Sequence, residues 1–147
     1  MANYIIRVDS STKPTTITIK SGQSAAAWIT QVGNSVIASG LIYCHHNGSN
    51  KTVYEGILAA LSQLETEHFY IGGTDTVKIF TDCKIVIDQL NGSSTIRMAK
   101  HLARVKAFCK RHPNVKFEFI YQNEKDLEYK KVDKLSKVGK NWIQKMI

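Results

Sequence analysis

A short stretch in the middle of the chain changes from a strand pattern to a helix pattern at a single acidic residue, Asp82. Residues 77–80 are Val-Lys-Ile-Phe, which are rich in the β-branched and aromatic side chains that favour a strand. Residues 84–90 then show helical spacing. Ligands of open α/β sheets bind outside the carboxyl ends of the strands, so a carboxylate at this junction is placed to hold a metal ion or a substrate. The competing interpretation is that Asp82 or Thr81 caps the helix. The predicted apolar face of this helix comprises Ile85, Val86, Gln89 and Leu90.

The elements around this junction follow the order β-β-β-α-β-α-α-β-α. Residues 4–9 are largely apolar and predict a buried strand that ends in the turn-forming sequence Asp9-Ser-Ser. Two further segments flank Gly33-Asn34 and predict an antiparallel hairpin, whereas residues 15–20 fit either an exposed strand or a loop. The other predicted ranges are strands 25–32, 35–44, 77–80 and 115–121 and helices 52–67, 84–90, 96–111 and one that starts at Tyr129.

The order of these elements indicates one mixed sheet. Three strands in succession favour an antiparallel meander, and the later strands, which are separated by helices, favour parallel additions to the same sheet. A chain of 147 residues has the size of one domain and can bury a core without disulfides. The sequence therefore predicts an α/β fold in a single domain over residues 1–147, with a central five-stranded sheet and helices on both faces.

The sequence carries no targeting or membrane signal. It contains no run of 18 or more apolar residues, and its first nine residues lack the basic start and long apolar stretch of a secretory signal. Cys44, Cys83 and Cys109 are odd in number and far apart, so they predict reduced thiols rather than a disulfide framework or a zinc site. We expect an intracellular, cytoplasmic protein with no membrane contact, although a nuclear location or association with a virus or mobile element stays open.

Positive charge is concentrated in the second half of the chain. The formal net charge is +8; residues 1–75 carry four Lys/Arg against five Asp/Glu, whereas residues 76–147 carry sixteen against seven. Clustered Lys and Arg favour a polyanionic partner, because binding to phosphates releases condensed counterions. The alternative is an ordinary solvated helix surface.

Four acidic residues occupy elements from which their side chains could meet. Asp9 is on the expected first strand, Asp82 at the end of a later parallel strand, Glu55 on the helix between them and Asp133 on the last helix. Like charges repel one another unless cations neutralise them, and Mg²⁺ takes carboxylate and phosphate oxygens as ligands. Two ions about 3.5–4 Å apart would stabilise the attacking and leaving oxygens of a phosphodiester. Each acid also has a structural interpretation: an Asx turn at Asp9, a capping box from Thr52 to Glu55, and local ion pairs at Asp133.

With these acids the chain resembles the ribonuclease H family over about residues 4–139. The resemblance lies in Tyr4-Ile-Ile-Arg-Val-Asp9-Ser-Ser, Thr52-Val-Tyr-Glu55-Gly-Ile-Leu-Ala-Ala-Leu61, Ile79-Phe-Thr-Asp82-Cys-Lys-Ile-Val-Ile-Asp-Gln-Leu90 and Val132-Asp133-Lys-Leu-Ser136. It implies a ribonuclease H-like fold and a metal-dependent endonuclease that cuts the RNA strand of RNA–DNA hybrids. It also implies two Mg²⁺ ions, for which Mn²⁺ can substitute, and four catalytic metal ligands: Asp9, Glu55, Asp82 and Asp133.

Several departures from the family pattern leave other functions open. Cys83 stands where the family usually has a Ser after the acid, residues 122–125 lack the His that many members carry, and Tyr129 replaces a common Asn. The segment between Asp82 and Asp133 also leaves little room for the extra basic helix of some members. One alternative is therefore a non-catalytic module that binds hybrids or duplexes. Another is a 3′–5′ exonuclease, which is disfavoured because its first strand usually bears a second acid where Ser11 stands here.

Polar and basic residues near the predicted site are candidates for substrate recognition. Proteins distinguish RNA from DNA by contacts to the 2′-hydroxyl groups, and the polar residues after the first strand and before the first helix could make them. We expect a monomer, either autonomous or part of a larger polyprotein such as a reverse transcriptase. The candidate substrate-binding residues are Ser10, Ser11, Asn47, Asn50, Lys84 and Arg104.

Overall fold

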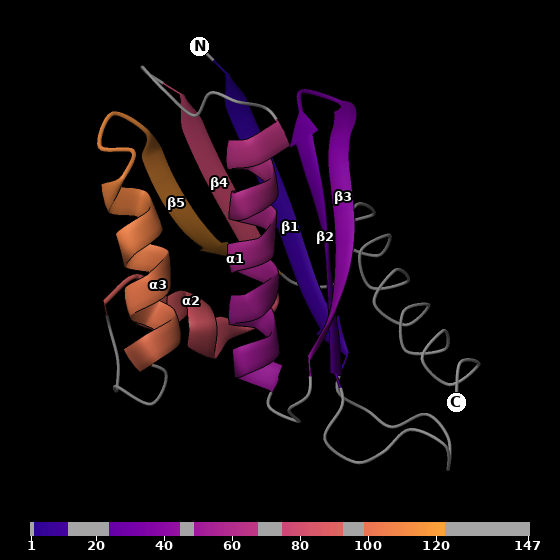
Figure 1. Ribbon diagram of the computed structural model, residues 1–147, viewed down its shortest axis with the longest axis vertical. Coiled ribbons are helices and arrows are strands. Elements are labelled where there is room, and N and C mark those ends of the chain that lie inside the picture. Colours follow the sequence, from indigo (N-terminus) through magenta and orange to yellow (C-terminus); the bar gives the residue numbers. More distant parts are fainter. Residues whose placement is uncertain (1, 12–23, 45–48, 68–74, 93–98, 123–147) are drawn as a thin grey trace, which may run out of the picture.

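In the computed structural model, residues 2–11, 24–44, 49–67, 75–92 and 99–122 are described, and five strands within them form one sheet (Figure 1). The strand order is β3-β2-β1-β4-β5. β1 pairs antiparallel with β2 and β2 with β3, whereas β4 is parallel to both β1 and β5. The predicted mixed five-stranded sheet, a meander with parallel additions, is therefore confirmed. The strands are β1 Asn3–Ser11, β2 Ser24–Val32, β3 Ser35–Cys44, β4 Thr76–Thr81 and β5 Lys116–Tyr121.

Three helices accompany the sheet in the described ranges: α1 Ser49–Glu67, α2 Lys84–Leu90 and α3 Ala99–Lys110. Figure 1 shows α1 and α3 side by side across one face, with α2 near the end at which β1 and β4 finish. None of these described helices is long and apolar enough to cross a membrane. The predicted helix from Tyr129, and with it the expectation of helices on both faces, lies outside the described residues, as does the segment 15–20.

The main core lies between this face of the sheet and the two long helices. Alternate residues of the central strands point toward the helices, and an apolar stripe of α1 and another of α3 are buried against them. Trp28 of β2 also covers this face, and its indole Nε1 donates a hydrogen bond of 2.7 Å to Oε1 of Gln63. The buried residues include Tyr4, Ile6, Val8, Val77 and Ile79 from the strands and Val53, Ile57, Ala60, Leu61, Leu64, Val105 and Phe108 from the helices.

The predicted hairpin is confirmed, with Val32 paired to Ser35 across a turn in which Gly33 has a φ of 59°. This left-handed conformation is accessible to glycine at no steric cost, which is why the sequence can reverse direction within two residues.

Two predicted boundaries and one side chain are wrong. β1 does not end in a turn at Asp9, because Asp9, Ser10 and Ser11 continue the antiparallel pairing with β2. α1 begins at Ser49 rather than Thr52. Ile85 was expected on the inward face of α2, yet it is 56% exposed, and the neighbouring Ile87 is buried instead. A helix of seven residues has two turns, too few for its apolar spacing to define one face.

A charged cluster joins α1 to the C-terminal end of α3, far from the acids of interest. Both carboxylate oxygens of Glu65 lie 3.1 Å from Nη2 of Arg111, and Nε2 of His112 lies 2.6 Å from Oε2. The ring of Phe108 packs against both partners, with the Arg111 guanidinium 4.9 Å from its centroid. The hydrogen bond from His112, followed by the contacts from Arg111, holds the pKa of Glu65 below its ordinary value.

Substituting Glu65 tests this cluster. Because the folded-state pKa of Glu65 is lowered, its contribution to stability is present above the unfolded pKa and is lost as the pH falls through the folded value. Glu65→Gln is therefore expected to destabilise the protein by about 1 kcal/mol near pH 7, with the difference from wild type shrinking below pH 4. Urea unfolding at both pH values measures this. Glu67→Gln, which alters an exposed acid on the same helix, should show no such pH-dependent difference.

Candidate active site

The carboxyl ends of β1 and β4 are neighbours in the sheet and carry two of the four predicted acids. The parallel register pairs Arg7 with Phe80, and the Arg7 guanidinium lies 5.4 Å from the centre of the Phe80 ring, so both side chains share one face. Two residues further along each strand direction are Asp9 and Asp82. Asp9 is only 5% exposed, and Asp82 is half-buried. Asp9 on β1 and Asp82 directly after β4 therefore each lie two residues beyond the pair Arg7–Phe80, at the same end of two neighbouring strands.

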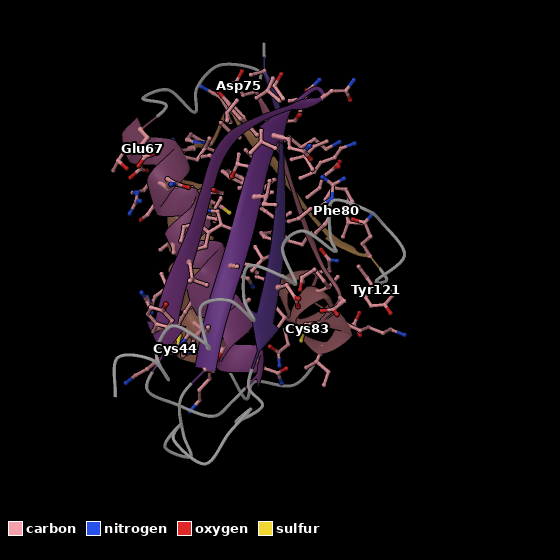
Figure 2. The ribbon with its side chains drawn as sticks, turned by 90° about the vertical axis from the view of Figure 1, so that its right-hand side faces the viewer. Cys44, Glu67, Asp75, Phe80, Cys83 and Tyr121 are labelled. Atoms are coloured by element: carbon pink, nitrogen blue, oxygen red, sulfur yellow. The ribbon has the colours of Figure 1, made fainter. Side chains whose placement is uncertain are left out.

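Figure 2 shows which end of the molecule this is. Asp75, before β4, lies at one end of the sheet, and Cys83, after β4, lies at the other end together with Cys44 at the close of β3. The pKa of the Cys44 thiol is raised by burial first and next by the negative charge of Glu55. Glu55 lies at this end as well, because the adjacent Gly56 approaches Val8, the residue before Asp9.

The structure does not make Asp82 a helix cap. The N-cap of α2 is Cys83, in an extended conformation and without a side-chain cap bond. Its backbone N–H donates to Oγ1 of buried Thr81 at 3.3 Å, and its thiol donates to Oδ1 of Asn50 at 3.2 Å. Burial raises the pKa of this thiol, which keeps it protonated and able to donate. Thr81 and Cys83 therefore fix the strand-to-helix junction on either side of Asp82.

The carboxylate of Asp9 takes part in a local hydrogen bond, in which Oδ1 accepts the backbone N–H of Ser10 at 2.8 Å. Because both residues are within β1, the predicted Asx turn at a strand end is not formed. The carboxylate of Asp9 is held instead by a strand that is paired on both sides, with β2 and with β4.

Glu55 lies in the second turn of α1 and is turned toward α3. Its Oε1 lies 2.9 Å from Nη1 of Arg104 and 3.1 Å from Nε2 of His101. The predicted capping box is wrong, because Thr52 is inside the helix, fully buried, with its hydroxyl 2.6 Å from that of Ser24. The helix starts at Ser49, three residues earlier than predicted, so Thr52 is not at its first position.

The backbone beside Glu55 approaches the sheet closely at Gly56. A Cβ at this position would lie 2.8 Å from Cγ1 of Val8 and 2.9 Å from Cβ of Ala26. Real Cβ atoms do not come so close, so only glycine allows α1 to rest on β1 and β2 here. Because Val8 immediately precedes Asp9, this contact sets the distance between the helix that carries Glu55 and the strand that carries Asp9.

A buried hydrogen bond joins α1 to α2 near the candidate site. The hydroxyl of Tyr54 donates to Oε1 of Gln89 on α2 at 2.6 Å, and its ring lies 5.8 Å from that of His101. Burial, with a smaller effect of Cys83, raises the pKa of Tyr54 to about 12, so its hydroxyl remains a donor at neutral pH. Tyr54 thus links α1, which carries Glu55, to α2, which begins two residues after Asp82.

The chemistry of the donors fits a hard cation only in part. Among the described residues, no three His, Cys, Asp or Glu side chains lie close enough together to hold a metal ion. Asp9 and Asp82 supply carboxylate oxygens, the ligand type of Mg²⁺ and Mn²⁺. Glu55 is engaged on α3, and Asp133 lies outside the described residues.

The candidate substrate-binding residues have mixed positions. Asn50 is in the first turn of α1, where it accepts the Cys83 thiol, and not in the predicted loop. Lys84 is exposed at the start of α2, and Arg104 contacts Glu55. Ser10 belongs to β1, and its backbone N–H bonds Asp9. Asn47 and the side chain of Ser11 lie outside the described residues.

Sequence reasoning overlooked His101, which had no expected role. Its spacing of three residues from Arg104 places both on one face of α3, and this was the available signal. What the signal could not give is the partner, because Glu55 is 46 residues away in the chain.

Comparisons with known proteins show which solved structures share this fold. No family model and no curated protein sequence matches the chain. Among solved structures, the N-terminal RNase H domain of Rv2228c from Mycobacterium tuberculosis is similar with a TM-score of 0.72 at 15% identity, over 96% of this chain and 95% of that one. RNase H1 from the archaeon Halobacterium salinarum is similar with a TM-score of 0.72 at 16% identity, over 92% of this chain and 95% of that one.

A third similar structure is LC11-RNase H1, isolated from compost by a metagenomic approach. It gives a TM-score of 0.74 at 16% identity, over 97% of this chain and 99% of that chain. The structure of the same protein in complex with an RNA/DNA hybrid gives a TM-score of 0.69 at 16% identity, over 90% of this chain and 98% of that chain. The match extends over almost the full length of each of these proteins and includes the sheet that carries Asp9 and Asp82. The chain therefore has the ribonuclease H fold.

Proposed function

We propose that this chain is an endonuclease that hydrolyses the RNA strand of RNA–DNA hybrids with the help of Mg²⁺. The observation that supports this most is the parallel register that brings Asp9 and Asp82 to adjacent ends of the two central strands in a ribonuclease H fold. A neighbour with this fold, LC11-RNase H1, was solved with an RNA/DNA hybrid bound. The proposed metal ligands are Asp9, Glu55, Asp82 and Asp133.

Asp9, Asp82 and Lys84 would have different tasks in the proposed site. Asp9, buried and fixed in β1, provides an oxygen at a constant position, and half-buried Asp82 provides one that solvent and substrate can reach. The carboxylates of Asp9 and Asp82 would hold a divalent cation, which would supply activation of water and stabilisation of the leaving oxygen of a phosphodiester. Exposed Lys84, two residues after Asp82, is placed to attract the nucleic acid backbone. The products would carry 5′-phosphate and 3′-hydroxyl ends.

A cleavage assay tests this proposal. The full chain is incubated with Mg²⁺ or Mn²⁺ and a hybrid whose RNA is labelled at its 5′ end and blocked at its 3′ end. We expect internal cuts in the RNA of the hybrid, no cleavage of single-stranded RNA or duplex DNA, and no cleavage with EDTA. Dependence on a free 3′ end would instead indicate an exonuclease.

The second candidate function is a module that binds hybrids without cutting them. The observation that favours it is the engagement of Glu55 by Arg104 and His101, which occupies one of the proposed ligands. It predicts binding that weakens as salt rises and no turnover at any metal concentration. Cleavage in the assay above would exclude it.

A further inference from the structure

One carboxylate oxygen of Glu55 is shared by two side chains of α3. Oε1 lies 2.9 Å from Nη1 of Arg104 and 3.1 Å from Nε2 of His101. The side chain of His101 is 17% exposed, that of Glu55 27% and that of Arg104 56%. The contact is therefore layered, with His101 inside and the guanidinium on the solvent side.

These contacts compete with a cation for the same atom. A carboxylate oxygen offers two lone pairs, and Oε1 of Glu55 uses both for its two donors. A metal ion can use Oε1 only if a donor leaves, and a guanidinium at 2.9 Å also repels a cation that approaches the other oxygen. Glu55 can therefore join a metal site only at the expense of its contact with α3.

The surroundings indicate which part can move. The backbone of α1 is fixed where Gly56 touches Val8 and Ala26, so Glu55 can change only its side-chain conformation. His101 packs beside the ring of Tyr54, which is tied in turn to α2. Arg104 is the exposed member of the group, with a long and flexible side chain, so it is the donor that can leave at the lowest cost.

We propose that Arg104, together with His101, is a positioning residue that holds Glu55 on α3 in the metal-free protein, so that metal binding beside Asp9 and Asp82 requires this contact to open. The inference rests on the proposed function, because it takes Glu55 as a ligand of that metal site. It assigns to Arg104 an effect on cation affinity that is present without any nucleic acid.

Mn²⁺ binding to the metal-free full chain tests this assignment, with free Mn²⁺ measured by electron paramagnetic resonance. Arg104→Gln is expected to bind Mn²⁺ about three- to tenfold more tightly than wild type. The matched control is Arg111→Gln, which removes the same charge from the residue that directly follows α3 and also breaks a 3.1 Å contact with Glu65 of α1, at the far end of both helices. Its affinity should stay within about twofold of wild type.

A second pair of variants separates the holding of Glu55 from a general effect of charge. If Arg104 acts through Glu55, adding Arg104→Gln to Glu55→Gln leaves the affinity unchanged. The inference is overturned if Arg104→Gln matches Arg111→Gln, or if its gain persists in the Glu55→Gln background. Asp82→Asn identifies the other kind of failure: if this variant binds Mn²⁺ as tightly as wild type, the proposed metal site is wrong and the inference falls with it.

Discussion

Asp82→Asn is expected to lower the rate of hybrid cleavage by about a thousandfold or more while leaving the fold intact. The amide keeps the shape of the side chain but removes the negative charge that a cation needs at the carboxyl end of β4. Asp82 is half-buried and is not the N-cap of α2, so the loss of its charge removes no cap. Initial rates with Mg²⁺ and with Mn²⁺ on the same labelled hybrid measure the effect.

The matched control for this substitution is Asp88→Asn. Asp88 lies on α2, six residues after Asp82 in the chain, and it is also half-buried. The Asp88→Asn variant should cleave the hybrid at a rate within about threefold of wild type, because it makes the same chemical change outside the proposed site. Thermal unfolding of both variants verifies that they are folded. Equal rates for Asp82→Asn and wild type would remove Asp82, and with it the proposed site.

Gly56→Ala is expected to destabilise the protein by about 1–3 kcal/mol and to lower cleavage about tenfold or more. At an open helical position this substitution would stabilise, by about 1 kcal/mol, since alanine is the better helix former. Here the new Cβ would meet Val8 at 2.8 Å and Ala26 at 2.9 Å, both of which are anchored in central strands. The helix must therefore move outward and carry Glu55 with it. Urea unfolding and the cleavage assay measure the two effects.

A second substitution shows whether this crowding is the cause. Val8→Ala removes the Cγ1 atom that the new side chain would meet. Although Val8→Ala alone should destabilise, the loss in the Gly56→Ala, Val8→Ala double variant should be smaller than the sum of the single losses. Strict additivity, or a stabilised Gly56→Ala variant, would contradict the close packing of α1 on the sheet.

Most of the fold could be predicted because its elements carry strong local periodicity. The apolar stripe of α1 repeats at helical spacing, and Gly33-Asn34 supplies the φ that a tight hairpin turn needs. The mixed sheet then follows from the order of the elements. The boundaries at Asp9 and Thr52 could not be predicted, because each depends on a partner in β2. Asp9 continues a strand pairing there, and the Thr52 hydroxyl contacts one 28 residues away.

Of the candidate site, the positions of Asp9 and Asp82 could be predicted from the sequence, but the contacts of Glu55 could not. Asp9 and Asp82 could be proposed as neighbours because the sequence predicts each at the carboxyl end of a strand, and parallel strands end at one edge of a sheet. The engagement of Glu55 could not be foreseen, since Arg104 is 49 residues away and is brought near only by the packing of α3 on α1. The role of Asp133 stays a prediction from the sequence.

The double pairing of β1 has a consequence for how the molecule comes apart. β1 is hydrogen-bonded to β2 along one edge and to β4 along the other, whereas β3 and β5 each have a single neighbour in the described sheet. Opening that begins at an outer strand leaves the strands of Asp9 and Asp82 joined to each other. We therefore expect β1 and β4 to be among the last strands to separate, so that fraying at β3 or β5 leaves Asp9 and Asp82 at neighbouring strand ends.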